Sequence, residues 1–207
     1  MASLSPPPPP PRFGDVLPIA PSPETLTFLA RRRSVSALTL TAPGPSETEL
    51  RDILTLAARA PDHGKLAPWR FIILRDEAKA AFVKGLEGIA ATRDDRVKSL
   101  AKLGKLRAPP VTVVVVSRAF AGGEIPVWEQ QLSAGAVCVL LLIAAQAMGF
   151  GANWITDWYA YDAAAMSLLG LAPAEAVAGY LHLGHCAEAP QERVRPDVTG
   201  VMQYWRP

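Results

Sequence analysis

The sequence predicts an α+β fold in which helices and strands pack in layers. Segments with apolar residues at helical spacing and short β-branched runs are mixed along the 207 residues, without the regular alternation that βαβ units would give. No internal repeat is visible. A chain of this length fits one domain and can bury a substantial core.

Composition excludes several functional classes. The net charge of +2 is too small to indicate binding to nucleic acid or to an anionic membrane. Cys138 and Cys186 form no C-x-x-C pair, so neither a disulfide framework nor a zinc site is supported, and a cytoplasmic location is expected. The longest apolar run, Ala136 to Ala145, is shorter than the ~18–20 residues of a membrane span. Half of the residues are hydrophobic, which indicates that a partner subunit covers part of the surface.

The chain begins with a proline-rich leader over residues 1–22, in which Pro6 through Pro11 are unbroken. Such a segment is expected to be extended or disordered, and the folded domain is expected over residues 23–207. Ser22-Pro23-Glu24 is a helix-start signal with a capping hydroxyl, a proline and an acid. This first helix runs into Arg31-Arg32-Arg33-Ser34.

A second helix is predicted from Ser46 until Pro61 stops it. Ser46 and Glu49 are three apart, as in a capping box, and apolar residues follow at helical spacing. Before this helix, Val35 to Thr41 is ambiguous and Pro43-Gly44-Pro45 predicts a turn.

The middle of the chain predicts two strands and two helices. A strand over Trp69 to Arg75 is followed by a helix that Asp76 caps. Residues Arg93 to Arg107 have the pattern of a mobile basic helix with a solvated charged face, which Pro109-Pro110 ends. The β-branched run from Val111 to Ser117 predicts a strand buried on both faces.

The last part of the chain is dominated by a long apolar helix from Trp128 to Met148, which Gly149-Phe150-Gly151 closes. The remaining predicted elements are a short strand over Trp154 to Thr156, a small helix over Asp162 to Leu169 and a strand over Ala176 to Leu183. The tail from Gly184 onward is expected to be irregular.

A polar loop follows the second helix. Its sequence is Arg59-Ala60-Pro61-Asp62-His63-Gly64-Lys65-Leu66-Ala67-Pro68-Trp69-Arg70-Phe71. Prolines and a glycine forbid continued helix here, and Asp62, His63 and Lys65 lie in a turn that is held on both sides. Loops fixed in this way often carry function, although a plain helix-to-strand connector is the alternative.

The cluster Arg31-Arg32-Arg33-Ser34 offers a second signal. Guanidinium groups and a hydroxyl at one helix end are suited to a phosphate, which guanidinium binds bidentately. The alternative is that cations simply favour a helix C-terminus, where each contributes about 0.3–1 kcal/mol. The cluster alone supports both interpretations equally.

Together the two signals resemble the FMN-dependent nitroreductase family, and most closely its short subgroup with a Pro-Asp-His loop. An Arg-Arg-Ser follows the first helix, and Arg-Ala-Pro-Asp-His and Pro-Trp-Arg-Phe follow the second. The later motifs of the resemblance are Trp128-Glu129-Gln130, Gly149-Phe150-Gly151, Trp154-Ile155-Thr156 and Tyr180-Leu181-His182-Leu183-Gly184. The match spans about Glu24 to the C-terminus, without the leader, and its strength lies in the order and spacing of the motifs.

The resemblance implies a central, mostly antiparallel sheet flanked by helices, and a homodimer with a long interface helix and FMN in the subunit interface. Arg32, Arg33 and Ser34 would hold the ribityl phosphate. A basic residue after the last strand often assists in the family, and Arg193 or Arg195 could do so here, with Arg195 taken as the candidate.

The resemblance also implies which residues surround the flavin ring. Arg59, His63 and Lys65 would close over the cofactor, with Arg59 and His63 coming from the partner chain. The Trp154-Ile155-Thr156 strand would lie along the isoalloxazine and offer mainly backbone hydrogen bonds. The loop departs from the wider family, which has small hydroxyl residues and an asparagine where Asp62, His63 and Lys65 stand, and often a glutamine where Ala67 stands. These departures concern the ring contacts and the substrate pocket rather than the cofactor.

The implied activity is a flavin-dependent oxidoreduction in which FMN takes hydride from NAD(P)H and passes electrons to nitroaromatic or quinone-like acceptors in a ping-pong scheme. No side chain need act as a nucleophile, and His63 is a possible proton donor. The alternatives are an FMN-dependent dehydrogenase of a specialised metabolite and a non-catalytic flavin-binding protein. No metal site is expected around His182 and His185, because no carboxylate or cysteine stands at ligand spacing.

Overall fold

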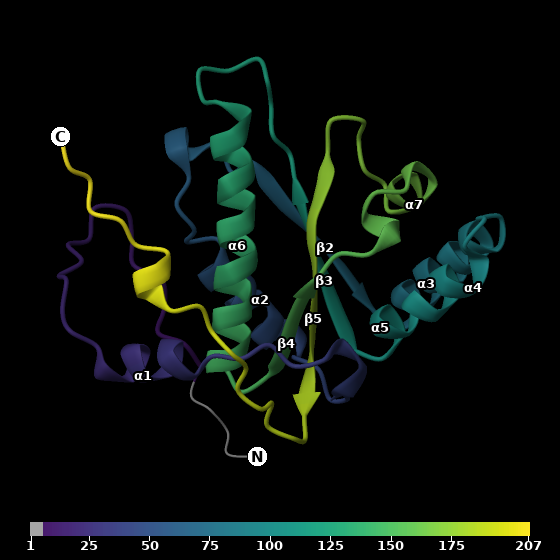
Figure 1. The fold of residues 1–207 in the computed structure, drawn as a ribbon, viewed down its shortest axis with the longest axis horizontal. Helices are drawn as coiled ribbons and strands as arrows, with labels where there is room; N and C mark the ends of the chain where they lie inside the picture. Colours follow the sequence, from purple (N-terminus) through teal and green to yellow (C-terminus); the bar gives the residue numbers. More distant parts are fainter. Residues whose placement is uncertain (1–5) are drawn as a thin grey trace.

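A computed structural model describes residues 6–207, which fold as a sheet between two layers of helices (Figure 1). Four strands pair antiparallel in the order β1-β5-β3-β2. The fifth strand, β4, pairs antiparallel with β5 on the same edge of β5 as β1. The strands are β1 (Leu40–Thr41), β2 (Trp69–Arg75), β3 (Val111–Ser117), β4 (Gly151–Ile155) and β5 (Ala176–Cys186). The predicted α+β class with a mostly antiparallel sheet is confirmed.

The helices divide between the two faces of this sheet, as Figure 1 shows, with α2 and α6 on one side and α3, α4, α5 and α7 on the other. Their bounds are α1 (Pro23–Arg31), α2 (Glu47–Ala57), α3 (Asp76–Ala91), α4 (Arg96–Lys102), α5 (Gly104–Arg107), α6 (Val127–Ala147) and α7 (Ala163–Leu168). Short 3₁₀ turns occur at η1 (Ala37–Thr39), η2 (His63–Lys65), η3 (Trp158–Ala160) and η4 (Val198–Gly200).

Strand β3 joins the two cores because every one of its residues is buried. Val113 and Val115 belong to the core beneath α2 and α6, whereas Val114 and Val116 belong to the core beneath α3. Successive side chains of a strand point to opposite faces, so a strand covered on both faces needs a continuous apolar run. The prediction made from this β-branched run is confirmed.

The two predicted helix starts are also confirmed. The Ser22 side chain accepts a hydrogen bond from the Thr25 N–H at the start of α1. At α2, Ser46 Oγ accepts from the Glu49 N–H at 3.3 Å, and Glu49 Oε2 accepts from the Ser46 N–H at 2.8 Å. This reciprocal pair closes the capping box.

The expectation that Asp76 caps the next helix is wrong. Asp76 is the first residue of α3, and Arg75 holds the capping position without a side-chain hydrogen bond. Asp76 has a φ of +48° and pairs with Arg75 Nε at 2.9 Å. Because strand β2 runs directly into α3, no residue remains to form an ordinary cap.

The expectation of one mobile basic helix over Arg93 to Arg107 is wrong as well. This segment forms α4 and α5, with a break at Leu103, and Leu103 and Leu106 are fully buried. Arg93 anchors its start, because Arg93 Nη1 binds Asp162 at 2.8 Å and the guanidinium lies 4.8 Å from the centre of the Trp158 ring. Packing against the α3 core therefore fixes the segment.

Strands β4 and β5 are longer at the same end than their sequences predict. β4 begins at Gly151 and stops before Thr156, and β5 continues past Leu183 to Cys186. A Cβ on Gly151 would lie 2.6 Å from the Leu40 side chain, so the close approach of β1 and β4 requires a glycine there. Glycine normally weakens a strand, and this packing outweighs that tendency.

The chain ends differ from the core. Residues 6–22 contain no helix or strand, and residues 1–5 of the predicted leader lie outside the described part. The 1–22 and 23–207 division therefore stays a prediction. Residues 187–207 carry only η4 and expose several apolar side chains, namely Val194, Val198, Val201, Met202, Tyr204 and Trp205. Both cysteines are free.

By length and composition, α6 is the one helix within residues 6–207 that could cross a membrane. Half of its most apolar stretch is buried against the rest of the fold, as in the core helix of a folded domain. It packs on α2 and on strands β3, β4 and β5.

Candidate functional site

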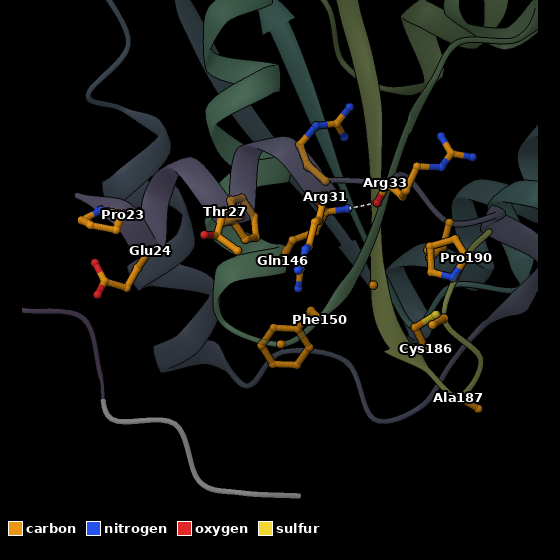
Figure 2. Close-up of a pocket in the computed structure, with 16 residues that line it drawn as sticks. Pro23, Glu24, Thr27, Arg31, Arg33, Gln146, Phe150, Cys186, Ala187 and Pro190 are labelled. Atoms are coloured by element: carbon orange, nitrogen blue, oxygen red, sulfur yellow. Dashed lines mark hydrogen bonds between the residues drawn. The ribbon is translucent and has the colours of Figure 1, made fainter. Parts of the chain in front are cut away.

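The segment between α1 and β1 is held in place by hydrogen bonds on either side of Ser34. Gln146 Nε2, near the end of α6, donates to the Arg33 carbonyl, a bond drawn in Figure 2. Asn153 Nδ2, on β4, donates to the Val35 carbonyl. The Val35 N–H donates to the Ala152 carbonyl at 3.2 Å. These bonds fix the backbone that carries the predicted phosphate residues.

The predicted basic residues of this segment meet the tail. Arg33 Nε lies 3.7 Å from Glu192 Oε1, and Arg195 Nε lies 3.2 Å from the same oxygen. Arg195 Nη2 also donates to the Arg32 carbonyl at 3.3 Å. Arg195 is thus a tail arginine that joins the cluster through these bonds, and its role in holding a phosphate stays a prediction.

The cluster has the electrostatics of an anion site. The Arg193 N–H, and then Arg195 and Arg33, hold the pKa of Glu192 below its usual value. One terminal nitrogen of Arg32, Nη1, is buried without a hydrogen-bond partner among the described residues. A buried guanidinium nitrogen without a partner is costly unless an anion binds it. The Glu192 carboxylate shows what kind of group these arginines take.

A groove of about 960 Å³ lies beside this cluster, between α1, the end of α6 and the start of the tail (Figure 2). Its polar residues include Arg31, Arg32 and Arg33, and Gln146 lies on its floor. Its apolar residues include Phe28, Val35 and Phe150. The combination suits a ligand with an anionic end and an apolar body.

Strand β4 leads from this cluster toward Thr156 and leaves one edge without a neighbouring strand. The Ala152 carbonyl points away from β5 and accepts a hydrogen bond from Val35. Alternate residues of a strand direct their backbone groups to the same edge, so the N–H and C=O groups of Trp154 also point away from β5, to the open edge. The Trp154 indole itself packs on Gly179 and donates to the Ala178 carbonyl at 3.2 Å. Trp154 can therefore offer its backbone at the open edge while its ring is used in packing. Thr156 lies just beyond the strand and accepts a hydrogen bond from Tyr161 at 3.0 Å.

The polar loop is a strained turn built on Asp62. Asp62 Oδ1 accepts from the Leu66 N–H at 3.2 Å, and Oδ2 accepts from the Ala67 N–H at 2.8 Å. Lys65 and Ala67 have positive φ angles of 57° and 45°, which cost energy for residues with a side chain. Asp62 satisfies the backbone of the turn, so its role is to shape the loop.

His63 is directed by the start of α6. His63 Nδ1 lies 2.6 Å from Glu129 Oε2, and both side chains are largely exposed. Ser133, one turn further along α6, donates to the Pro61 carbonyl at 2.7 Å and accepts from Trp69 Nε1 at 3.2 Å. The first turns of α6 thus hold the loop at both ends, and the Trp69 ring packs against the core beneath α6.

The predicted site residues form two groups that lie far from each other within one chain. His63 contacts Glu129 near the beginning of α6, whereas Arg33 contacts Gln146 near its end. Glu129 and Gln146 are 17 positions apart on one helix, which at ~1.5 Å per residue is about 25 Å. Arg59 and Lys65 lie in the His63 half, and Arg59 faces Pro7–Pro11 of the leader across a small hollow.

Several residues of the site were not predicted from the sequence. Gln146, Asn153, Glu192 and Glu129 reach their partners over long sequence separations, and only Glu129 lies in a motif that the sequence singles out. Trp158 and Tyr159 belong to the α3 core and not to the site. Within residues 6–207, no group of three or more metal-ligating side chains occurs.

The α+β fold carries a basic cluster near one end of the long helix α6 and a polar loop near the other end. The nitroreductase family matches residues 29–185, and the chain belongs to that family. The chain is 33% identical over 189 residues to YdjA of Escherichia coli (strain K12), which is named provisionally as an NAD(P)H nitroreductase; the alignment covers 88% of this chain and all of that protein. A Haemophilus influenzae relative with the same provisional activity is 34% identical over 83% of this chain and 94% of its own.

Solved structures show the same fold. A nitroreductase-like protein from Bacillus cereus superposes with a TM-score of 0.79 at 22% identity, covering 90% of this chain and 98% of the other. A Desulfovibrio desulfuricans protein, solved in complex with FMN, superposes with a TM-score of 0.69 at 22% identity, covering 90% and 100%. The expected nitroreductase-like architecture is therefore confirmed.

Proposed function

We propose that the chain is a homodimeric, FMN-dependent oxidoreductase that uses NAD(P)H to reduce nitroaromatic or quinone-like acceptors. The single observation that carries this proposal is the basic cluster held at the end of α6, in which Arg33 and Arg195 share a carboxylate and a buried Arg32 nitrogen has no partner in the described chain. Family membership supports the class of reaction. A cytoplasmic location belongs to the proposal as well.

The residues present fit a flavin mononucleotide. Arg32, Arg33, Ser34 and Arg195 would hold its phosphate, as guanidinium groups and a hydroxyl suit a dianion. The open edge of β4 would offer the Trp154 backbone to the ring system. When bound, FMN would supply hydride acceptance from NAD(P)H and reduction of the acceptor in two half-reactions.

The second subunit follows from the distance along α6. Glu129, which contacts His63, lies about 25 Å along α6 from Gln146, which binds the Arg33 carbonyl. We therefore infer that the partner's copy of the polar loop, with Arg59, His63 and Lys65, closes over each cofactor. Exposed apolar residues on α1 and α6 support a dimer, because large exposed apolar side chains are common at subunit interfaces. They are Leu26, Leu29, Trp128, Leu132 and Val139.

Side chains of the protein would position the cofactor and protonate the acceptor. Arg33 and Arg195 would neutralise the phosphate, and His63, held at Nδ1 by Glu129, would present Nε2 to the closed site. His63 Nε2 could then hydrogen-bond the acceptor and deliver a proton to it. A closed site between two subunits also excludes water from these groups.

Mixed dimers test the shared site. Arg33→Ala and His63→Ala subunits with different affinity tags are co-expressed, and the heterodimer is purified through both tags. If each site takes Arg33 from one chain and His63 from the other, the heterodimer has one intact site and one doubly damaged site. We expect it to bind about half the wild-type amount of FMN and to recover about half of the wild-type turnover, while each homodimer is impaired.

A heterodimer that is as impaired as both homodimers would show that each site is built within one chain. A monomer mass in light scattering would contradict the dimer directly. Flavin binding without bleaching by NADPH or NADH would favour the dehydrogenase alternative, and flavin binding without any turnover would favour the non-catalytic alternative.

A further inference from the structure

A second cavity lies under the opposite helical layer and includes none of the candidate cofactor residues. It has a volume of about 600 Å³ and is formed by α3, by the connection from α5 to β3 and by the loop after β1. Its apolar wall includes Ala42, Ala80, Val83 and Pro110. Lys79 lies within it, and Lys84 lies one turn further along α3.

Lys79 is the unusual member of this cavity. It is only 6% exposed, and its Nζ donates to the Pro109 carbonyl. Within residues 6–207, no carboxylate lies within ion-pairing distance of Nζ. The two carboxylates of the cavity have other partners, since Asp76 pairs with Arg75 and Glu87 pairs with Arg107. A buried ammonium without a counterion is unfavourable, and burial lowers the pKa of Lys79 to about 8.

The other charged groups around Lys79 do not reverse this effect. From β5, His182 is fully buried, and burial followed by the charges of Lys79 and Lys105 lowers its pKa to about 3, so His182 is neutral. Lys84 and Arg107 line the same cavity as Asp76 and Glu87, so these four side chains together add no net charge around Lys79. At neutral pH the fraction of Lys79 in the free-amine form is therefore well above that of an ordinary lysine.

We propose that Lys79 is an acylation site whose acyl donor is a small acyl phosphate. The neutral amine is the nucleophilic form of lysine, and desolvated lysines are used in this way elsewhere. Arg107, which also lines the cavity, would attract the phosphate end of the donor. The apolar wall at Ala80 and Val83 would receive the acyl group.

The chemistry is balanced without another reactant. The Nζ lone pair of Lys79 attacks the acyl carbonyl, the C–N bond forms, and the bond from the acyl carbon to the phosphate oxygen breaks. The phosphate leaves with that electron pair, and the surplus Nζ proton passes to solvent or phosphate. The resulting amide keeps one N–H, which can still donate to the Pro109 carbonyl, so the folded structure tolerates the product.

The experiment treats the full-length, flavin-loaded protein with acetyl phosphate across pH 6.5 to 9.5, and peptide mass spectrometry follows each lysine with time. Lys84 is the matched internal control, because it lines the same cavity from the same helix but is exposed. We expect Lys79 to be acetylated at least about tenfold faster than Lys84 at pH 7.5, and its rate to level off above pH 8 while the Lys84 rate keeps rising.

An Ala80→Trp variant distinguishes the cavity from general reactivity. Ala80 is an exposed residue of the cavity lining, so a larger ring can be accommodated there, and we expect Lys79 acetylation to slow at least about fivefold with Lys84 unchanged. In urea-unfolded protein the two lysines should react equally. Acetylation of Lys79 at or below the rate of Lys84 in the folded protein would overturn the proposal, as would an unchanged Lys79 rate in folded Ala80→Trp.

Discussion

His63 Nδ1 lies 2.6 Å from Glu129 Oε2, so the first turn of the long helix α6 sets the orientation of the one histidine in the polar loop. The two residues are 66 positions apart in the chain. An acid in the first turn of a helix is itself stabilised by the helix dipole. Glu129 can therefore hold the imidazole in one tautomer and leave Nε2 directed outward.

We predict that Glu129→Gln separates positioning from stability. The pair is exposed, so the free energy of unfolding should fall by at most about 1 kcal/mol. Acceptor reduction should fall about tenfold in kcat/KM, because the amide no longer fixes the imidazole and small displacements of a reacting group are costly. Denaturant unfolding and steady-state kinetics measure the two effects. Glu124→Gln, in the loop before α6, is the control, and an equal kinetic loss there would remove the special role of Glu129.

Arg33→Lys is predicted to weaken FMN binding by roughly 1–3 kcal/mol, the scale of a hydrogen bond to a charged group. A lysine keeps the charge but loses the planar fork that binds phosphate bidentately. Arg51→Lys is the control, because Arg51 pairs with Glu47 on α2 and does not line the groove. Fluorescence titration of FMN measures both, and equal affinities for wild type and Arg33→Lys would exclude Arg33 from the phosphate site.

Gly179→Ala is predicted to disturb the open edge of β4 from the opposite strand. A Cβ at this position would lie 2.0 Å from Trp154 Nε1, so the indole must move. We expect a loss of about 1–3 kcal/mol in unfolding free energy, as in overpacked cores, together with weaker FMN binding. Gly88→Ala is the control, because its Cβ would meet nothing within 4 Å. A Gly179→Ala protein with unchanged stability and flavin affinity would show that the Trp154 packing is dispensable.

Stability at low pH should depend on Glu175. Its carboxylate accepts two hydrogen bonds from Arg70 at 2.7 Å and one from the Ala172 N–H at 3.0 Å, and Arg70 chiefly holds its pKa at about 2. Because the folded pKa is lowered from 4.5, the stabilisation is fully present above pH 4.5 and is lost as the pH falls through 2.

Glu175→Gln should therefore cost about 1–3 kcal/mol at pH 7, and this difference should shrink toward pH 2. Urea unfolding at several pH values measures it. Glu47→Gln, which removes a largely exposed pair with Arg51, should change stability by no more than about 0.5 kcal/mol. A Glu175→Gln penalty that stays constant from pH 7 to pH 2.5 would contradict the assignment.

Local signals in the sequence predicted most of the elements correctly. The capping box at Ser46 and the continuous apolar run of β3 depend only on neighbouring residues, and both match the structure. The prediction for Asp76 was wrong because a capping residue needs a connection between strand and helix, and strand β2 runs directly into α3. The break at Leu103 depends on packing against α3, which the charge pattern of the segment does not express.

The charged residues of the candidate site could be named from the sequence, and their roles stay a prediction. The residues that hold their backbone in place could not be named. Arg33 and Arg195 could be named from a basic cluster and a family resemblance. Gln146 and Asn153, whose amides fix the backbone around Ser34, lie 113 and 118 residues from their partners and carry no local signal. Glu192 was not predicted because a phosphate site is expected to be lined by basic residues, and an acidic side chain beside them is not.

The most direct test of the account is the visible absorption spectrum of the purified protein, recorded with added FMN before and after anaerobic NADPH or NADH. We predict flavin bands that remain with the protein after gel filtration, bleach with the reduced nicotinamide and return on addition of a quinone. A protein that stays colourless after incubation with FMN and gel filtration would contradict the assignment of the arginine cluster and, with it, the proposed function.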